Sequence, residues 1–245
     1  MGNRIASAIR DLLFPPRCVG CGDLLAPFSG SDAIFCPLCR TAWEFAVAEA
    51  SGRAAEDAAR GLVYLTFYRS GRADGVPERL IYHLKHRGDP RVFRFVARRL
   101  GPRVLRTAET LPTRAGTDAA EGKRAVLFTY PPRRSSAVRR DGFDQAGRLA
   151  KALSETCGGD FVPLLRHTRR HTVEQKELGA EARAENVRGA YKLRGNASAL
   201  VRGRVVAICD DVCTTGATLN RCACLLVEAG AAAVVLVTVE RTESR

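Results

Sequence analysis

Two almost continuously apolar stretches flank a helical pattern near the C-terminus of the chain. Residues 205–209 read VVAIC and residues 233–239 read AVVLVTV, while residues 216–229 place Leu, Cys and Ala on one face of a helix. Strands that are buried on both faces lose the polar alternation of exposed strands. Their alternation with helices is typical of a parallel sheet covered on both sides. The sequence therefore predicts an α/β fold.

The rest of the chain extends this pattern. Strands are predicted where β-branched and aromatic residues gather, at 62–68, 125–130 and 161–165. Helices are predicted from apolar periodicity at 4–13, 76–106 and 143–156, the second of them broken near Gly88-Asp89-Pro90. Two polar segments are predicted to be a surface loop, at 107–122, and a long loop or loosely packed hairpin, at 166–190.

The segment that follows the 205–209 strand has the composition of an anion site. Asp210 and Asp211 end the strand, a turn rich in Thr and Gly comes next, and a helix then begins. Backbone N–H groups at a helix N-terminus bind phosphate, while paired carboxylates suit ribose hydroxyls and, through them, a Mg²⁺ ion. The alternative is a chance acidic turn. We predict Asp210 and Asp211 as catalytic residues and a phosphate-binding set of Val212, Cys213, Thr214, Thr215, Gly216, Ala217 and Thr218.

Four of the nine cysteines form two Cys-x-x-Cys pairs near the N-terminus, Cys18 with Cys21 and Cys36 with Cys39. Zinc takes four thiolates in a tetrahedral arrangement, and the 14 residues between the pairs allow a hairpin that brings them together. Four ligands leave no open position, so the expected role is structural. The alternative is four reduced thiols that pack a small core. We expect a zinc-binding unit at 1–45, a linker at 46–59 and a larger domain at 60–245. The composition of residues 44–60 is compatible with either a helix or a linker.

The chain is strongly basic, with a net charge of +13, and Arg carries almost all of the excess. Residues 79–106 alone hold nine Lys and Arg residues and one acid, Asp89. Arginine presents a planar fork that suits phosphate groups, so a polyanionic partner is expected: a nucleic acid or a small phosphorylated ligand. A solvated basic surface is the alternative.

No segment has the pattern of a membrane span or a secretion signal. Apolar runs fall short of the roughly 20 residues that cross a bilayer, and Arg10 and Asp11 interrupt the apolar part of the N-terminus. We therefore expect a cytoplasmic location.

The segment 205–218 resembles the 5-phosphoribosyl-1-diphosphate (PRPP) signature of type I phosphoribosyltransferases: four apolar residues, Asp-Asp, an apolar residue, any residue, and Thr-Thr-Gly-x-Thr. The resemblance implies a type I phosphoribosyltransferase-like parallel sheet with flanking helices, preceded here by the small zinc ribbon. It also implies a pyrophosphate loop at Pro132, Arg133 and Arg134, and a mobile loop with Arg166, Gln175 and Arg183.

The order of motifs along nearly the whole chain is similar to that of the ComF family of competence-associated proteins. These motifs are Leu-Phe-Pro-Pro before the cysteines, His-Leu-Lys-His-Arg-Gly-Asp at 83–89, Tyr-Pro-Pro at 130–132, and Arg-Asp-Gly-Phe-Asp-Gln at 140–145. The chain departs from the family in the last of these, where the usual reading is Arg-Gly-Phe-Asn-Gln. Here Asp141 precedes Gly142 and Asp144 replaces Asn, and an added carboxylate repels an anion.

Three functions follow as hypotheses, of which one is a zinc-ribbon scaffold, formed by the N-terminal 40 residues, that docks a DNA-uptake helicase. The family resemblance implies a PRPP- or ribose-5-phosphate-binding protein with Mg²⁺ that acts on single-stranded DNA in natural transformation through its Arg-rich surface. The alternative is an active Mg²⁺-dependent phosphoribosyltransferase. The sequence does not identify the acceptor of this reaction, because it shows no pattern of a nucleobase pocket.

Overall fold

The computed structural model describes residues 15–25, 33–69, 75–113, 125–168 and 189–243. Its centre is a five-stranded parallel sheet in the order β1-β9-β7-β3-β4, which confirms the predicted α/β class. The strands are β1 (Leu62–Val63), β9 (Ala233–Val237), β7 (Val205–Cys209), β3 (Leu127–Thr129) and β4 (Asp160–Phe161). The helix predicted at 4–13 lies outside the described residues.

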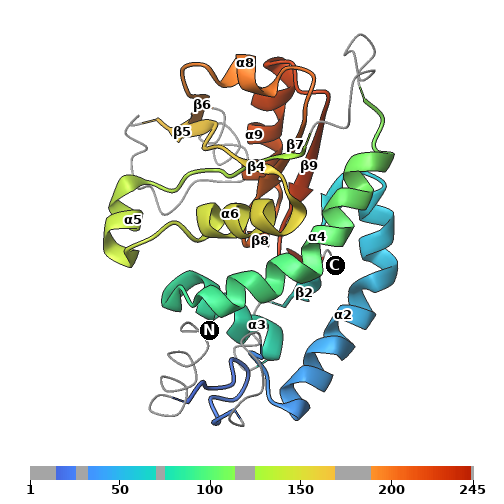
Figure 1. Cartoon of the computed structure of the whole chain (residues 1–245), viewed down its shortest axis with the longest axis vertical. Coiled ribbons are helices and arrows are strands. Elements are labelled where there is room, and N and C mark those ends of the chain that lie inside the picture. The colour runs from blue at the N-terminus through green and yellow to red at the C-terminus, as the bar shows by residue number, and fades with distance from the viewer. Residues whose placement is uncertain (1–14, 26–32, 70–74, 114–124, 169–188, 244–245) are drawn as a thin grey trace, which may run out of the picture.

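The central strand β7 explains why the apolar run is continuous. Ala207 and Cys209 pack into one apolar cluster, while Val206 and Ile208 pack into another on the opposite face of the sheet. The first cluster includes α4 (Pro90–Thr110) and α6 (Gln145–Cys157), and the second includes α9 (Ala217–Glu228) and α8 (Ala197–Val201). Helices therefore cover both faces, as Figure 1 shows.

The structure divides one predicted strand, at 62–68, and adds a further short strand after each of the predicted strands at 205–209 and 233–239. The chain bends after β1, β7 and β9 and continues into a second parallel sheet of β2 (Thr66–Tyr68), β10 (Glu240–Thr242) and β8 (Val212–Cys213), in the order β2-β10-β8. The prediction of one continuous strand at 62–68 was therefore wrong. The residues at its bend, Tyr64 and Leu65, are as apolar as the strands on either side, so the pattern gave no sign of a break.

The predicted break in the 76–106 helix has a clear cause. Helix α3 (Val76–Tyr82) runs into a π-helical turn, η1 (His83–Arg87), which ends at Gly88 in the left-handed conformation, with a φ of 61°. The Asp89 carboxylate then accepts a hydrogen bond from the Arg91 N–H at 2.9 Å and caps α4, whose first residue is Pro90.

The apolar segment at 161–165 also belongs to two elements. After β4, residues 165–167 form β5 (Leu165–His167), which pairs in antiparallel fashion with β6 (Tyr191–Leu193). This pairing agrees with the hairpin alternative for 166–190, although residues 169–188 lie outside the described part. A short helix that the sequence did not predict, α5 (Ser135–Asp141), follows the loop after β3.

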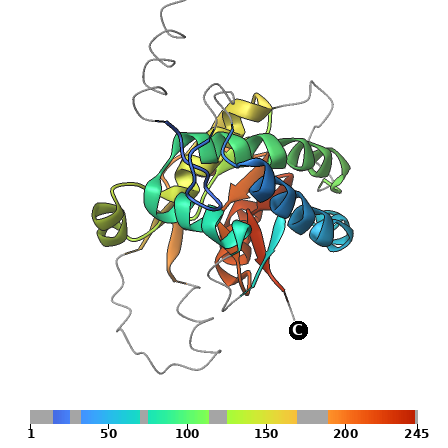
Figure 2. The ribbon, with the colours of Figure 1, turned by 90° about the horizontal axis from the view of Figure 1, so that it is seen from below.

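The N-terminal residues share a core with the sheet domain. Helix α2 (Pro37–Ala58) includes most of the expected linker at 46–59. The rings of Phe35, Trp43 and Phe95 pack together with centroids 5.5 to 5.9 Å apart, and this cluster is continuous with the α4 and α6 side of the sheet. Figures 1 and 2 show the described residues 15–25 and 33–36 beside α3 and the first turns of α4.

Within the described ranges, the helices are all too short or too polar to cross a bilayer.

Candidate functional site

The acid pair lies where β7 bends to become β8. The Asp210 N–H donates to the Val237 carbonyl at 2.9 Å, and the Asp211 carbonyl accepts from the N–H groups of Val239 and Glu240 at 3.0 and 3.2 Å. The bend between the two sheets is therefore held by the backbone of the neighbouring strand. It places the carboxylates at the carboxyl end of a central parallel strand, where open α/β sheets bind ligands.

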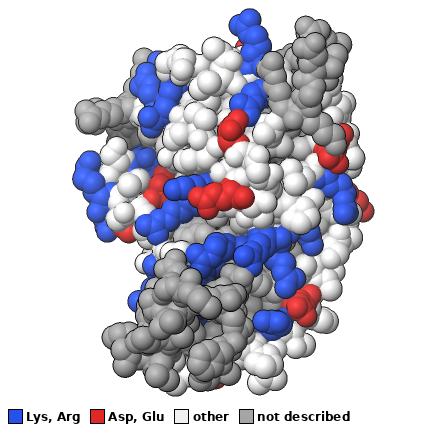
Figure 3. All heavy atoms as spheres, viewed as in Figure 1, with Lys and Arg blue, Asp and Glu red and all other residues white. Residues whose placement is uncertain are grey.

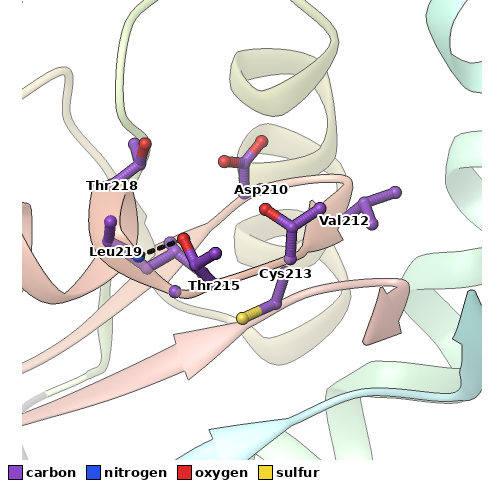
Figure 4. Close-up of a pocket in the computed structure, with 9 residues that line it drawn as sticks. Asp210, Val212, Cys213, Thr215, Thr218 and Leu219 are labelled. Atoms are coloured by element: carbon purple, nitrogen blue, oxygen red, sulfur yellow. Dashed lines mark hydrogen bonds between the residues drawn. The ribbon is translucent and has the colours of Figure 1, made fainter. Parts of the chain in front are cut away.

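The turn after the acid pair forms a small pocket of about 60 Å³, lined by Asp210 and residues 212–219. Gly216 has a φ of 72° and is the N-cap of α9, so a residue with a side chain would be strained there. The Thr215 hydroxyl accepts from the Ala217 N–H at 3.4 Å. Figure 4 shows the Asp210 carboxylate and the Thr218 side chain on the same side of the turn. The structure thus brings all the predicted phosphate-binding residues, 212–218, around one opening.

Cys213 and Cys222, which lie in and just after the turn, are buried. Cys213 is 7% exposed, its sulfur points away from the Asp210 carboxylate in Figure 4, and burial raises the pKa of its thiol. Burial likewise raises the pKa of Cys222 to about 12. Because the thiolate is the nucleophile, these thiols act as core groups.

The surroundings of Asp210 disfavour its charged form. Burial, and then the neighbouring charge of Asp211, raise the pKa of Asp210 well above its ordinary value. Two adjacent carboxylates in a site of low polarity resist being ionised together. A ligand that donates hydroxyl hydrogen bonds to this pair would relieve that repulsion.

The Asp211 side chain contacts two other elements, α6 and η1. It is 8% exposed, and its carboxylate accepts from the Gln145 amide of α6 at 3.3 Å. The Lys85 ammonium of η1 lies 3.5 Å from the same oxygen. The other Gln145 amide atom, Oε1, accepts from the Arg133 guanidinium at 2.7 Å. A line of contacts therefore connects the loop after β3 with the acid pair.

The loop after β3 holds the three residues predicted to contact pyrophosphate. Pro132 is buried, Arg133 is half-buried and Arg134 is exposed at the N-terminus of α5. The Arg133 N–H donates to the Asp144 carboxylate at 3.0 Å. That carboxylate also caps α6 by accepting from the Gly147 N–H at 3.2 Å, so the Asp that replaces the family's Asn anchors this loop to the helix.

The second departure from the family pattern, Asp141, binds the same arginine. Its carboxylate lies 2.8 Å from the Arg133 guanidinium and 2.9 Å from that of Arg140. Arg140 and then Arg133 lower the pKa of Asp141 to about 2. An anion that binds Arg133 must therefore compete with Asp141.

Of the predicted mobile-loop residues, Arg166 lies exposed on β5, and Gln175 and Arg183 are outside the described residues. Tyr191 on β6, which pairs with His167 of β5, hydrogen-bonds the Thr218 side chain. Burial is the main reason that its pKa rises to about 12.

Sequence reasoning missed three polar residues of the site: Lys85, Gln145 and Tyr191. Two of them stand inside motifs that carried the family resemblance, His-Leu-Lys-His-Arg-Gly-Asp and Arg-Asp-Gly-Phe-Asp-Gln. Their place within these motifs was the sequence signal that could have identified Lys85 and Gln145 as site residues. Tyr191 gave none.

Glu240 lies beneath the acid pair, in the middle strand of the second sheet. It is fully buried, and its Oε1 accepts from the Thr66 hydroxyl at 3.3 Å, while its Oε2 has no hydrogen-bond partner within the described part of the chain. Burial raises the pKa of Glu240 to about 8, and the charge of Glu78 adds to the effect. The buried carboxyl therefore retains its proton well above the usual range for Glu.

The four N-terminal cysteines converge. The sulfur atoms of Cys18, Cys21, Cys36 and Cys39 all lie within 4.8 Å of one another, and those of Cys21 and Cys36 are 3.8 Å apart. Thiolates bound tetrahedrally to zinc at about 2.3 Å stand roughly 3.8 Å apart. The donor set and its spacing therefore fit a zinc ion.

Neighbouring residues pack closely against the four-cysteine cluster. A Cβ atom on Gly20 would lie 2.6 Å from the Cys39 sulfur, so this position requires glycine. The Arg79 guanidinium of α3 donates to the Gly20 carbonyl at 2.5 Å. Burial raises the pKa of Cys18, but backbone N–H donors, with Cys36 first, outweigh it and lower that pKa to about 7.

Comparison with known families defines the class of the larger domain. Residues 137–245 match the phosphoribosyl transferase domain, which covers α6, the acid pair, the Thr–Gly turn and the last strands. The chain therefore carries a phosphoribosyl transferase domain, as the signature at 205–218 predicted.

Individual relatives narrow the assignment. Over 97 residues the chain is 39% identical to the DNA utilization protein YhgH of Escherichia coli K12, and over 91 residues it is 34% identical to competence protein F of Haemophilus influenzae. The aligned residues make up 39% and 37% of this chain, respectively. They span 40% and 39% of the lengths of these two relatives. This homology confirms the predicted relationship to the ComF family.

Solved structures give weaker matches. The allosteric regulatory enzyme of purine biosynthesis aligns with a TM-score of 0.36 and 18% identity, over 64% of this chain and 30% of that one. A glutamic acid mutant from a study of an invariant aspartic acid in HPRTs aligns with a TM-score of 0.35 and 14% identity, over 60% and 65% of the two chains.

Proposed function

We propose that this protein binds PRPP, or a related ribose phosphate, together with Mg²⁺, and that it acts on single-stranded DNA during DNA uptake. The observation that carries the ligand proposal is the acid pair at the bend between the two sheets, with the Thr–Gly turn and the N-terminus of α9 directly after it. This arrangement offers carboxylates for ribose hydroxyls and backbone N–H groups for a phosphate.

The size of the turn pocket indicates which part of the ligand it takes. About 60 Å³ suits a single phosphate group rather than a nucleobase. The 5-phosphate would bind residues 214–218, and the ribose hydroxyls would contact the carboxylates of Asp210 and Asp211. A Mg²⁺ ion, when bound, would neutralise part of the charge of the diphosphate group.

The alternative is an active phosphoribosyltransferase. In that reaction a nucleophile would form a bond to C1 of the ribose while the bond from C1 to the pyrophosphate oxygen breaks, and pyrophosphate would leave with the electron pair. The acid pair would hold the ribose in place. This alternative predicts an acceptor site, and the described residues lining the turn pocket do not supply one.

The DNA-handling proposal is supported by the relatives and by the charge of α4. The relatives are named for DNA utilization and competence. Figure 3 shows a band of Lys and Arg across the face in which α4 lies, and this helix bears Arg94, Arg98 and Arg99. Of the aromatic residues in the basic segment, Phe93 is buried, whereas Tyr82 is 50% exposed and contacts the exposed His86 ring at 4.8 Å. Exposed aromatic rings among cations are typical of surfaces that stack unpaired bases.

We further propose that the four cysteines hold a structural zinc ion, that the zinc unit docks a DNA-uptake helicase and that the protein is cytoplasmic. A pull-down of the helicase with wild-type protein and with Cys36→Ser tests the docking. Retention by both would contradict it.

The experiment that tests the proposed ligand is a thermal-shift titration with PRPP and Mg²⁺, followed by an assay of pyrophosphate release with a panel of nucleobases. Stabilisation without release supports a binding protein, and base-dependent release supports the enzyme. No thermal response to PRPP or ribose 5-phosphate overturns the ligand proposal.

A further inference from the structure

The side chain of Lys85 reaches the candidate site from outside the matched domain. Its ammonium lies 3.5 Å from the Asp211 carboxylate, and the side chain is 37% exposed. The domain match begins at residue 137, so this lysine is supplied by the preceding segment. An ammonium has three N–H donors, and a single ion pair leaves others available to a ligand.

The backbone around Lys85 is unusual. Residues 83–87 form a π-helical turn, closed by a hydrogen bond from the Gly88 N–H to the His83 carbonyl at 3.1 Å. The additional residue of a π turn rotates the following side chains by roughly 100° relative to a continuous α-helix. Leu84 remains buried in the core while its neighbour Lys85 extends to the acid pair. π-Helical turns occur frequently at functional sites.

The acid pair has two distinct sides. Asp210 lines the small Thr–Gly pocket, whereas the contacts of Asp211 run to Lys85 and, through Gln145, to Arg133. If the 5-phosphate occupies the turn pocket, the opposite end of the ribose lies on the Asp211 side. In PRPP that end carries the diphosphate.

A protein cation on the Asp211 side, in addition to Mg²⁺, favours binding of the diphosphate end. Two adjacent carboxylates repel a diphosphate, and Arg133 is already paired with Asp141 at 2.8 Å. Lys85 is the cation placed directly beside the Asp211 carboxylate. Its ammonium offsets the charge of the acid pair and presents donors to an incoming phosphate oxygen.

We propose that Lys85 binds the diphosphate end of the ligand and thereby distinguishes PRPP from ribose 5-phosphate. This inference rests on the proposed ligand. It adds a binding residue that lies on η1 and assigns the two ends of the ligand to the two sides of the acid pair.

The test is isothermal calorimetry on the 245-residue chain with three probes, each in the presence of Mg²⁺: PRPP, ribose 5-phosphate and inorganic pyrophosphate. We expect Lys85→Ala to weaken PRPP and pyrophosphate binding by roughly 10- to 100-fold, the usual effect of losing a charge-assisted hydrogen bond. Ribose 5-phosphate binding should change by less than about threefold. Lys85→Arg should restore most of the affinity for PRPP. The exposed Lys151 of α6 supplies the matched control, Lys151→Ala.

The outcomes separate this inference from the proposed function. If the wild-type protein binds PRPP and Lys85→Ala binds it equally well, the Lys85 inference is overturned and the proposed ligand stands. If Lys85→Ala weakens PRPP and ribose 5-phosphate to the same extent, Lys85 acts only through Asp211, which also overturns the inference. If the wild-type protein binds none of the three probes, both proposals fail together.

Discussion

The Gln145 amide lies 3.3 Å from the Asp211 carboxylate, although the two residues are 66 positions apart in the chain. Gln145 is almost fully buried at the start of α6, and its other amide atom accepts from Arg133 at 2.7 Å. The neutral Gln145 side chain thus hydrogen-bonds both the Asp211 carboxylate and the Arg133 guanidinium of the loop after β3. A single buried side chain therefore joins the acid pair to the loop after β3.

We predict that Gln145→Leu destabilises the protein by about 1 to 3 kcal/mol, because it leaves a buried carboxylate without its amide donor. PRPP binding should weaken as well. Urea unfolding and calorimetry measure the two effects. Gln145→Glu keeps the shape but places a third carboxylate beside Asp211, so we expect it to be worse than Leu for PRPP. Full affinity in both variants would contradict the proposed connection.

A second prediction concerns the cysteine cluster. Cys36→Ser, or treatment with a strong chelator, should lower the melting temperature markedly, because the cluster packs into the same core as α4 and the sheet and metal binding contributes folding free energy. Metal analysis should find close to one zinc per wild-type chain and less in the variant. Cys157→Ser, at the end of α6 and outside the cluster, is the control. An unchanged zinc content in Cys36→Ser would count against the site.

Glu240 predicts a pH dependence of stability. Its pKa is raised from 4.5 to about 8 by burial, so the folded state binds the proton more tightly than the unfolded state does. The resulting stabilisation is present in full below about pH 4.5 and is lost as the pH rises through about 8. Glu240→Gln should flatten this part of the curve of unfolding free energy against pH. Identical curves for the two proteins would show that Glu240 does not titrate in this range.

A fourth prediction tests the basic face. Reversal of Arg94, Arg98 and Arg99 to Glu should strongly weaken binding of an oligo-dT strand and reduce the salt dependence of the residual binding, because phosphate contacts release counterions. Tyr82→Ala should weaken binding about 5- to 100-fold with little change in salt dependence, since stacking carries no charge. Reversal of the exposed Arg53, Arg60 and Arg202 supplies a charge-matched control. Equal losses in the two triple variants would indicate a general charge effect.

The sequence was most informative where the signal is local. Residues 205–218 predicted a buried strand, an acid pair, a Thr–Gly turn and a helix, and these elements follow one another in the structure at β7, β8 and α9. The strand pattern depends on burial, and the turn depends on Gly216, whose φ of 72° favours glycine. Neither requires knowledge of distant residues. The Cys-x-x-Cys spacing was informative for the same reason.

The features that were not predicted depend on contacts between distant segments. The bend after β1 is fixed by the Leu65 N–H, which donates to the Val239 carbonyl at 3.0 Å, and no local pattern records that bond. Lys85 and Gln145 approach Asp211 only after the helices have packed. The N-terminal cysteines join the main core through the edge-to-face packing of Phe35 and Trp43 against Phe95, and the expected division into a zinc unit, a linker and a separate domain did not anticipate this contact.

A calorimetric titration of the wild-type protein and of Asp210→Asn with PRPP and Mg²⁺ tests most directly whether the acid pair binds the ribose phosphate. We predict saturable binding at one site per wild-type chain, a loss of at least about tenfold in affinity for the variant, and unchanged binding of oligo-dT by both proteins. Wild-type and variant proteins that bind PRPP equally, or not at all, would contradict this prediction.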